Sequence, residues 1–540
     1  MRLLLVSLAT IAISLLPQTA KANNIFDILW GKPTLQVEWT YSTGVFDESA
    51  AEIVAYDSAT HRIFVTNGND QAVDVLDVEG NKIGAIDVSG IGSPDSTPTS
   101  VASFNGLIAI AVDPDDTAVR GNVLFVDASS LSVKSTVEVG FLPDMVTFTP
   151  NGKKVVVANE GEPSDDYTLD PEGSISIITV GDGTQPSVKE AGFTAFNSQE
   201  AELKAKGVRI FGPNASVAQD LEPEYVAVSA DSKTAYVCLQ ENNAVAVVDL
   251  RRGIVRSVAA LGFKDHSIPG NGIDASNRDD AINIQNWPTL GMYQPDSIAT
   301  YKFLGWTFVI TANEGDARDY DGFSEEERVE DLTLDPAAYP NAATLQSEEN
   351  LGRLKTTSAT GDTDGDGDFD QIYSYGARSF SIWSISRRGN ATQIYDSGDD
   401  FEQITASELP LDFNSTDDEN DSFDNRSDDK GPEPEALTIG HDLFQSYSLV
   451  GLERVGGIML YEITNPFSPR FIEYKNNRDF AGDAEAGTAG DLAPEGIVFV
   501  SRSKSPFTEP VVVVSNEVSG TTTLYRVKRT GGIFSAWLND

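Results

Sequence analysis

Acidic residues stand at two positions of a pattern that returns seven times along the chain, and these acids are its clearest candidates for chemistry. In the best copies, Pro followed by Asp or Glu opens an alternating apolar strand, and after a turn a Val/Ile-rich strand ends in Asn-Glu or a near variant. Carboxylates gathered in one place suit hard cations, and crowding raises their pKa unless positive charge compensates. The acids at these positions are Asp144, Glu160, Glu224, Glu241, Asp296, Glu314, Glu435, Glu453, Glu495 and Glu517.

Part of this set is expected to bind divalent metal ions. The metal-ligand candidates are Glu160, Glu224, Glu314, Glu435 and Glu495. The sequence leaves open whether the chain is an enzyme; the catalytic candidates would be Glu160, Glu314, Arg318, Glu435 and Arg454. In that case Arg318, Arg378 or Arg454 could hold phosphate oxygens. Some of the acids could instead cap turns or accept backbone N–H bonds.

One local motif has the spacing of a calcium loop. Acids at positions 1, 3 and 5, Gly at 6 and Asp at 9 match the template, whereas position 12 is Tyr373 and not the usual Glu. A bidentate ligand would therefore have to come from elsewhere in the chain. The predicted ligands for Ca²⁺ are Asp362, Asp364, Asp366, Asp368 and Asp370.

The repeated pattern also predicts the fold that positions these acids. Units of four short strands with Gly, Asn, Asp or Pro at the junctions are typical of β-propellers, and seven copies predict an all-β, seven-bladed β-propeller. The last unit has only three strands, so Gln36–Tyr41 is expected to complete it beside Thr521–Val527 and close the ring. In such blades the start of the first strand and the end of the second lie on one face. The ten acids should therefore meet at one channel mouth.

Two long acidic insertions, at about residues 315–376 and 397–433, are expected on the same face. Functional residues concentrate on such loops. The second insertion carries the run Asn414–Asp421 and continues to Lys430. It could donate ligands to the same ions or be a flexible, solvated stretch.

Composition limits the classes of partner. There are 83 acidic and 38 basic residues, for a formal charge of −45. This balance excludes most nucleic-acid roles and disfavours anionic membranes, because both need basic patches. Divalent cations are the natural partners, although surface acids can also serve solubility alone.

Residues 1–22 have the pattern of a secretory signal: Arg2, an apolar stretch from Leu3 to Leu16, and Ala20-Lys21-Ala22 as a cleavage site. An uncleaved N-terminal anchor is the alternative. Residues 23–540 are then expected to form a single propeller domain without a later membrane span. Cys238, the only cysteine, cannot form an internal disulfide and lies in an apolar strand pattern.

Several stretches resemble signatures of the choice-of-anchor I family. They include Ala158–Ser164, Leu239–Ala244, Thr311–Tyr320, Ser427–Glu435, Gly451–Gly457 and Asn516–Thr522. The chain is also similar to mesenchyme-specific cell-surface glycoproteins and to bacterial secreted proteins labelled alkaline phosphatase. The resemblance implies a propeller fold, secretion and calcium, without implying an activity.

The combined prediction is a secreted, calcium-binding β-propeller that acts as an extracellular or cell-surface binding protein. It would be periplasmic, extracellular or at the cell surface. The alternative is a calcium-dependent phosphoester hydrolase, alkaline phosphatase-like or phytase-like, with its site at the acidic mouth. There, clustered ions would bind the phosphate and activate water.

Overall fold

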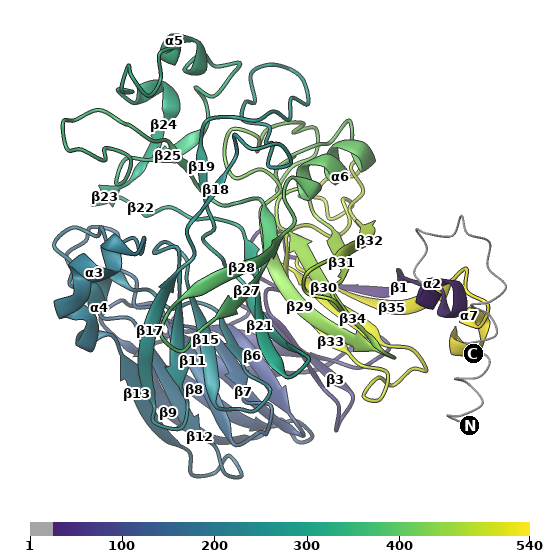
Figure 1. Cartoon of the computed structure of the whole chain (residues 1–540). Coiled ribbons are helices and arrows are strands. Elements are labelled where there is room, and N and C mark those ends of the chain that lie inside the picture. Colours follow the sequence, from purple (N-terminus) through teal and green to yellow (C-terminus); the bar gives the residue numbers. More distant parts are fainter. Residues whose placement is uncertain (1–24, 540) are drawn as a thin grey trace.

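The computed structural model describes residues 25–539 and is built almost entirely from antiparallel sheets (Figure 1). The prediction of an all-β fold is confirmed. The proposed signal peptide, residues 1–22, lies outside the described residues. Among the described residues, no helix is both long and apolar enough to cross a bilayer.

Seven four-stranded antiparallel sheets make up most of the described chain, and we number them sheets 1 to 7 in chain order. Sheet 1 comprises β2 (Val54–Asp57), β3 (Arg62–Asn67), β4 (Ala72–Leu76) and β5 (Lys82–Asp87), and sheet 2 comprises β6 (Thr97–Phe104), β7 (Leu107–Asp113), β8 (Arg120–Asp127) and β9 (Val133–Phe141). Sheet 3 comprises β10 (Pro143–Phe148), β11 (Lys154–Asn159), β12 (Ser174–Thr179) and β13 (Ser187–Gly192). Sheet 4 comprises β14 (Val226–Val228), β15 (Thr234–Leu239), β16 (Ala244–Asp249) and β17 (Ile254–Ala260).

The later sheets contain strands that are distant in sequence. Sheet 5 comprises β20 (Ile298–Phe303), β21 (Trp306–Asn313), β27 (Ser379–Ile385) and β28 (Ala391–Asp396). Sheet 6 comprises β29 (Pro434–Asp442), β30 (Gln445–Leu452), β31 (Ile458–Glu462) and β32 (Arg470–Lys475). Sheet 7 comprises β33 (Pro494–Val500), β34 (Val511–Asn516), β35 (Thr521–Thr530) and β1 (Lys32–Ser42). The expected pairing is observed, with Gln36 opposite Arg526 and Tyr41 opposite Thr522. The N-terminal strand thus completes the last sheet.

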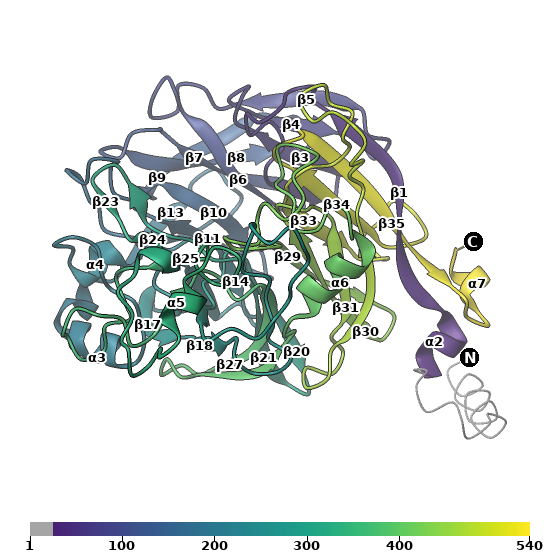
Figure 2. The ribbon, with the colours of Figure 1, turned by 90° about the horizontal axis from the view of Figure 1, so that it is seen from above.

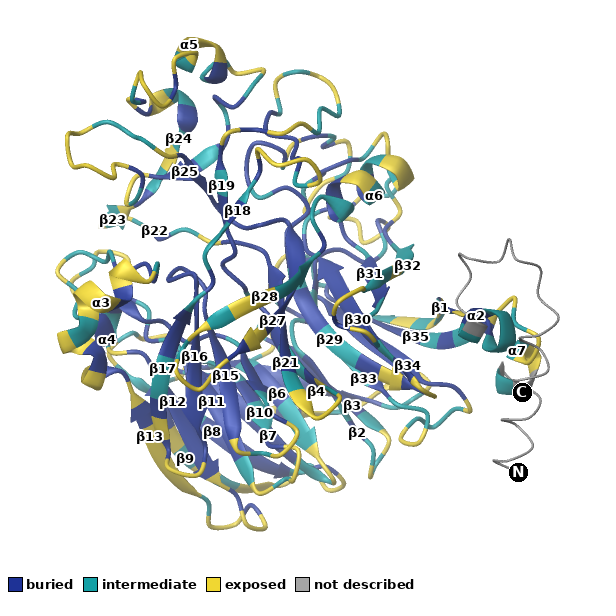
Figure 3. Ribbon diagram, in the orientation of Figure 1, coloured by how far each residue is buried: buried dark blue, intermediate teal, exposed yellow. Residues whose placement is uncertain are grey.

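The first strands of successive sheets contact one another throughout the series. The contacts run from β2 to β6, β10, β14, β20, β29 and β33, and β33 in turn contacts β2. Middle strands are buried on both sides: every residue of β15 and of β34 is buried, whereas β13 at the outer edge is mostly exposed (Figure 3). Continuous apolar runs such as Val511–Val514 therefore mark strands packed between two neighbouring sheets. Burying each such side chain contributes roughly 1.5–3 kcal/mol.

The insertions fold into a cap with a core of its own. Its five-stranded sheet joins β18 (Phe263–Asp265), β19 (Leu290–Met292), β26 (Tyr373–Ser374), β25 (Lys355–Thr357) and β24 (Glu326–Arg328), beside a hairpin of β22 (Asp319–Tyr320) and β23 (Phe323–Ser324). Trp287, Leu334 and Leu351 belong to the apolar cluster beneath it. The cap thus includes a segment before sheet 5 that the sequence did not reveal as an insertion.

Short helices occur between sheets 3 and 4, in the insertions and at the chain ends. They are α2 (Ile25–Trp30), α3 (Glu200–Ala205), α4 (Val217–Asp220), α5 (Ala342–Leu345), α6 (Asp400–Glu408) and α7 (Ser535–Asn539), with 3₁₀ turns at Thr194–Gln199 and Val329–Asp331. Seen from above, α5, β24, β25 and α6 lie over the sheets on one side of the molecule (Figure 2). Helices α2 and α7 lie together at the periphery, near the two chain ends (Figures 1 and 2).

Candidate metal centre

A bulge places the acid that follows Pro at the start of several first strands. Pro143 pairs with Asn159, yet regular pairing resumes only at Val146, so Asp144 lies in the irregular stretch between them. Glu435 and Glu495 occupy the same position after Pro434 and Pro494. Pro has no N–H to donate and suits the first residue of a strand, and a bulge redirects the side chain next to it. The Pro-acid pair therefore directs a carboxylate away from the hydrogen-bonded pairing of the two strands.

The Asn of the Asn-Glu motif ties the second strand of a sheet to the third. The Asn159 side-chain amide donates to the Ser174 hydroxyl at 3.1 Å and to the Ser176 hydroxyl at 3.0 Å. Asn313 donates in the same way to Ser379 and Ser381, at 3.1 and 2.8 Å. Both amides are fully buried, so each bond is costly to lose. The repeated Asn thus has a structural role, and it fixes the backbone position of the Glu that follows it.

Backbone strain recurs at the same edge of the sheets. The residue directly before Pro has positive φ in four copies, although this region is disfavoured for residues with a side chain and before Pro. Strain of this kind clusters at sites where structure serves function. The four residues are Leu142 (φ 45°), Gln294 (φ 36°), Glu433 (φ 46°) and Ala493 (φ 55°).

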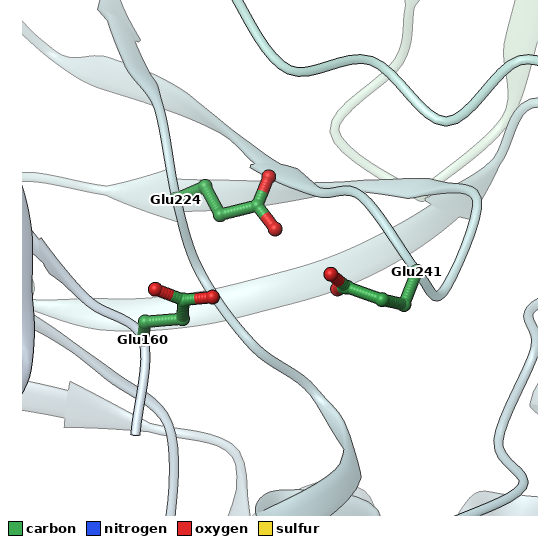
Figure 4. Close-up of side chains that lie close together, drawn as sticks. All are labelled: Glu160, Glu224 and Glu241. Carbon is green, nitrogen blue, oxygen red and sulfur yellow. The ribbon is translucent and has the colours of Figure 1, made fainter. Parts of the chain in front are cut away.

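Three carboxylates from sheets 3 and 4 converge to form the clearest metal-binding geometry. Glu160 follows β11, Glu224 precedes β14 and Glu241 follows β15, and their carboxylates point toward one another (Figure 4). One oxygen from each lies within 4.8 Å of the other two. Glu224 and Glu241 are each only 6% exposed. We call Glu160, Glu224 and Glu241 the glutamate cluster.

The glutamate cluster lacks positive partners. Oε2 of Glu224 and Oε2 of Glu241 are buried and accept no hydrogen bond from the described part of the chain. None of the three acids forms an ion pair with a described basic residue; the nearby Arg318 lowers the pKa of Glu241 only from a distance. A buried carboxylate oxygen without a partner costs of order 1–3 kcal/mol, more when charged. The glutamate cluster is therefore arranged to bind a positively charged partner that the described chain does not supply.

Burial and mutual repulsion raise the pKa of all three carboxyl groups. Burial, followed by the Asp316 charge, raises the pKa of Glu241 to about 7. Burial and then Glu241 hold the pKa of Glu224 well above its usual range, and burial and then Glu162 do so for Glu160. A bound cation would oppose both causes.

An acidic pocket of about 320 Å³ adjoins the glutamate cluster. Glu162, whose charge raises the pKa of Glu160, lines this pocket and accepts a 2.9 Å hydrogen bond from the Tyr320 hydroxyl. Other lining residues include Asp113, Asp115, Asp116 and Asp165. An acidic pocket of this kind concentrates cations near Glu162 and its neighbour Glu160.

A second group of three acids, Glu314, Glu433 and Glu453, also brings carboxylate oxygens within 4.8 Å of one another. Here the chain provides its own cations. Lys430 Nζ lies 2.5 Å from Glu314 and 3.1 Å from Glu433. Arg454 reaches Glu433 at 3.1 Å and Glu453 at 3.0 Å. Burial opposes ionisation of Glu433, but Lys430 and then Arg426 outweigh it and hold the pKa below the usual range. We call this the lysine-filled cluster.

The remaining first-strand acids lie close enough to other carboxylates to influence their ionisation. Burial is the main cause that raises the pKa of Glu435 and Glu495. The charges of Glu453 and Glu495 add to it at Glu435, and those of Glu517 and Asp296 add to it at Glu495. Burial and then Glu314 raise the pKa of Asp296, and Asp144 adds to the effect. Asp144 itself reaches a pKa of about 6, through burial and then Glu162. The interaction of acids from sheets 3, 5, 6 and 7 agrees with the expected gathering of carboxylates, and Oε2 of Glu435 also accepts no hydrogen bond from the described residues.

Two arginines considered as phosphate ligands are buried and already paired. Arg318 contacts Asp220 at 3.3 Å and Glu222 at 2.8 Å, and its guanidinium lies 4.6 Å from the Phe211 ring centroid.

Arg378 pairs with Glu402 at 2.5 Å and donates to backbone carbonyls of Asp274, Ser427 and Asp429. Arg454 is more exposed but is shared among Glu433, Glu453 and Asp417. Each of these three guanidinium groups therefore joins segments that are distant in sequence.

The second acidic insertion is folded and not a solvated run. Asp417 is buried against Arg454 at 2.6 Å, and Asp428 pairs with Arg328 at 2.7 Å. The same insertion delivers Lys430 to the lysine-filled cluster. This insertion thus contributes a positive charge beside Glu314 and Glu433, which counting its acids did not reveal.

The predicted calcium loop lies in the cap, exposed and apart from the glutamate cluster. Oxygens of Asp362, Asp364 and Asp370 lie within 4.8 Å of one another, and a second group joins Asp370 to Asp368 and Asp335. Partial burial, then Asp366 and Asp335, raise the pKa of Asp368 to about 6. Asp366 is not among the three-acid groups. Asp335 was missed because it lies about thirty residues before the loop, held there by a parallel bridge between Leu334 and Phe369.

The donor sets suit Ca²⁺ better than other common metals. They contain only carboxylate oxygens, which hard cations prefer over the His and Cys ligands of zinc. Three oxygens within 4.8 Å of one another lie no more than about 2.8 Å from a common centre, which is close to the calcium–oxygen range of about 2.3–2.6 Å. Magnesium needs shorter bonds and near-ideal octahedral geometry.

Comparison with known proteins shows the family of this chain. A family model described as the choice-of-anchor I domain matches residues 52–466. The chain belongs to the choice-of-anchor I family. The resemblance to this family and to mesenchyme-specific surface glycoproteins, inferred from the sequence, is therefore confirmed.

Two curated relatives illustrate the family. Gigasin-3a of Magallana gigas is 31% identical over 194 residues, which cover 34% of this chain and 67% of that protein. The mesenchyme-specific cell surface glycoprotein of Strongylocentrotus purpuratus is 27% identical over 321 residues, which cover 51% of this chain and 40% of that protein. The chain thus spans less than half of the second relative.

Two solved structures that match this chain are distant from it in sequence. Hydrazine synthase of Kuenenia stuttgartiensis matches with a TM-score of 0.46 and 12% identity, over 90% of this chain and 99% of that chain. The Cps50 (Swd1) β-propeller domain of Myceliophteria thermophila matches with a TM-score of 0.41 and 8% identity, over 92% and 100%. Scores below 0.5 do not bear on the chemistry of this chain.

Proposed function

We propose that this member of the choice-of-anchor I family is an extracellular β-propeller that binds Ca²⁺ in the glutamate cluster. The observation that carries the proposal is the pair of buried oxygens, Oε2 of Glu224 and of Glu241, that accept no hydrogen bond from the described chain. A cation there would offset the charge of three crowded carboxylates, as Lys430 and Arg454 together do in the lysine-filled cluster.

The proposal includes a closed ring of seven blades. Sheets 1 to 7 would be the blades, and the pairing of β1 with β35 would join the two ends of the chain. Such a ring explains why Glu160, Glu224 and Glu241 stay close without an internal cation. Each acid sits on a different strand end, and the neighbouring sheets fix their separation.

The loop Asp362–Asp370 would bind further calcium, with Asp335 supplying the ligand that its sequence template lacks. Its carboxylates are exposed or half-buried, and such acidic groups hold ions more weakly because water and salt screen them. We therefore assign the structural ion to the glutamate cluster and a weaker, cap-ordering ion to the loop.

An extracellular or cell-surface location rests on the relatives and on the proposed signal at residues 1–22. One relative is named a cell surface glycoprotein, and calcium is abundant outside cells. A stable fold without disulfides is consistent with the single, buried Cys238. Bound ions would then supply part of the stability that secreted proteins often draw from cross-links.

The second proposal, which the sequence also suggests, is that the protein hydrolyses phosphoesters at the same acidic mouth. It would need cationic groups free to hold phosphate oxygens, whereas Arg318, Arg378 and Arg454 each pair with carboxylates. Bound calcium would have to supply that positive charge alone. The geometry therefore favours binding over hydrolysis.

Calcium titration of chelator-treated protein by calorimetry tests the proposal. The double variant Glu224→Gln with Glu241→Gln should lose one bound ion and retain those of the loop. The matched control, Glu79→Gln with Glu138→Gln, removes two exposed acids and should bind as the wild type does.

Equal stoichiometry and affinity in both variants would overturn the metal assignment. Hydrolysis of p-nitrophenyl phosphate is measured alongside. Turnover that requires calcium and disappears in the Glu224/Glu241 variant would replace the binding proposal with the hydrolase.

A further inference from the structure

Basic residues concentrate at the end of sheet 4 that lies opposite the glutamate cluster. Glu241 follows the last residue of β15, whereas Thr234 is its first residue and pairs with Asp249 at the end of β16. A strand of six residues spans roughly 17–20 Å. Groups around Thr234 and Asp249 are therefore remote from the acidic mouth.

A pocket of about 280 Å³ opens at this end of the sheet. Four of its six lining residues are cationic and one is acidic, in a chain whose acids outnumber its bases by 83 to 38. The lining residues are Lys233, Thr234, Asp249, Arg251, Arg256 and Arg387.

Only part of this positive charge is balanced locally. Arg256 pairs with Asp249, and Lys233 lies 3.1 Å from Asp231 in an exposed pair, which contributes little. Arg251 and Arg387 form no ion pair with any acid in residues 25–539. Two guanidinium groups from different sheets thus line one pocket without a carboxylate partner.

Further lysines crowd the same rim. Lys154 donates to the carbonyl of Leu250, and Lys189 donates to the carbonyl of Arg252. Burial and then the Lys189 charge lower the pKa of Lys154, so these like charges repel one another. Their ammonium groups hold the turn that carries Arg251, and their charge adds to the positive field of the pocket.

The hairpin that carries Arg387 is held in place by close packing. Gly389 adopts φ +78°, and a side chain there would meet the Val258 carbonyl at 2.7 Å. The Ser257 hydroxyl lies 3.5 Å from the Arg387 carbonyl. Sheet 5 therefore presents Arg387 to the pocket of sheet 4 from a fixed backbone.

We propose that this pocket is a binding site for a tetrahedral oxyanion, phosphate or sulfate, held by Arg251 and Arg387. Guanidinium groups bind such anions through paired, charge-assisted hydrogen bonds, which are stronger than contacts between neutral groups. The site is separate from the glutamate cluster, so the molecule would bind cations on one face and an anionic group on the other. The proposal does not depend on calcium binding.

Neighbouring arginines in the same two turns provide a matched control. Arg252 and Arg388 directly follow the proposed ligands and are exposed as Arg251 and Arg387 are, but they do not line the pocket. The site variant is Arg251→Ala with Arg387→Ala, and the control is Arg252→Ala with Arg388→Ala. Both remove two positive charges from the same surface.

The experiment is titration of full-chain protein with inorganic phosphate and, separately, inorganic sulfate. It uses calcium-free buffer at physiological ionic strength, about 0.15 M, where diffuse attraction is screened beyond about 8 Å. Because the site variant loses both guanidinium ligands, it should bind at least about tenfold more weakly, while the control changes less than about twofold. The stronger of the two anions identifies the chemistry of the ligand.

Two results would overturn the proposal. One is equal weakening in both variants, which would mean diffuse attraction without a site. The other is absence of binding of either anion to the wild type at about 10 mM, since such a Kd corresponds to less than about 3 kcal/mol. Melting curves of both variants establish that they remain folded.

Discussion

Replacing Glu241 with Gln should stabilise the calcium-free protein, although Glu241 is buried in the glutamate cluster. Gln fills the same volume without a charge, and its amide can donate to a carboxylate oxygen of Glu224 that now lacks a partner. Most substitutions of buried polar residues destabilise a fold. The expected sign is therefore the opposite of the usual one.

The size of the effect follows from the pKa. Burial and Asp316 raise the pKa of Glu241 from 4.5 to about 7. Ionising this group in the folded state above pH 7 then costs about 3 kcal/mol of the free energy of unfolding, which the variant would recover. In a chain of 540 residues this corresponds to a rise in Tm of about 3 °C. With calcium at a hundredfold excess over Kd, the wild type would regain about 2.7 kcal/mol and the variant would not.

Differential scanning calorimetry at about pH 8, in chelator and in calcium, measures both effects. Glu433→Gln is the matched comparison, because Glu433 is equally buried but surrounded by Lys430, Arg426 and Arg454. Removing one partner from such a network costs about 3–5 kcal/mol, so its Tm should fall in either buffer. A fall in Tm for Glu241→Gln in chelator would show that Glu241 is an ordinary structural residue and refute the reasoning.

Three further predictions concern the loop, pH and the N-terminal strand. Asp370→Asn should abolish loop-bound calcium measured by calorimetry, whereas Asp335→Asn should only weaken it; equal affinity in both and in the wild type would exclude the loop as a site. A carboxyl group with a raised folded-state pKa reduces stability increasingly as pH rises from its unfolded to its folded pKa. Calcium-free protein should thus melt at a higher temperature at about pH 6 than at pH 8, and calcium should cancel this difference; a flat or reversed dependence in chelator would contradict it. Leu35→Ala, in the buried part of β1, should cost about 2–5 kcal/mol, and an unchanged melting curve would mean that the pairing of β1 with β35 contributes little.

The main sheets could be predicted from sequence because their strands carry strong local patterns. Val511–Val514 is a continuous apolar run, and it is buried between neighbouring sheets. Gln36–Tyr41 was placed by topology, because the last unit lacked a strand. The cap sheet could not be found this way. Strands of two or three residues, such as β25 and β26, carry no periodicity and are selected by pairing partners distant in sequence.

The candidate site was only partly predictable for a similar reason. The repeated motifs marked Glu160, Glu224 and Glu241 as acids of one mouth, but not which of them would lack a cation. That depends on Lys430, which arrives from an insertion and pairs with Glu314. The repeated motif locates each acid in the sequence. The basic residue that pairs with an acid can come from an insertion, whose fold no repeated sequence motif predicts.

An anomalous difference map from crystals grown with calcium tests the central claim most directly. The account predicts a calcium peak between Glu160, Glu224 and Glu241, at about 2.3–2.6 Å from an oxygen of each. A map without a peak there, with the three carboxyl groups hydrogen-bonded to one another, would contradict it.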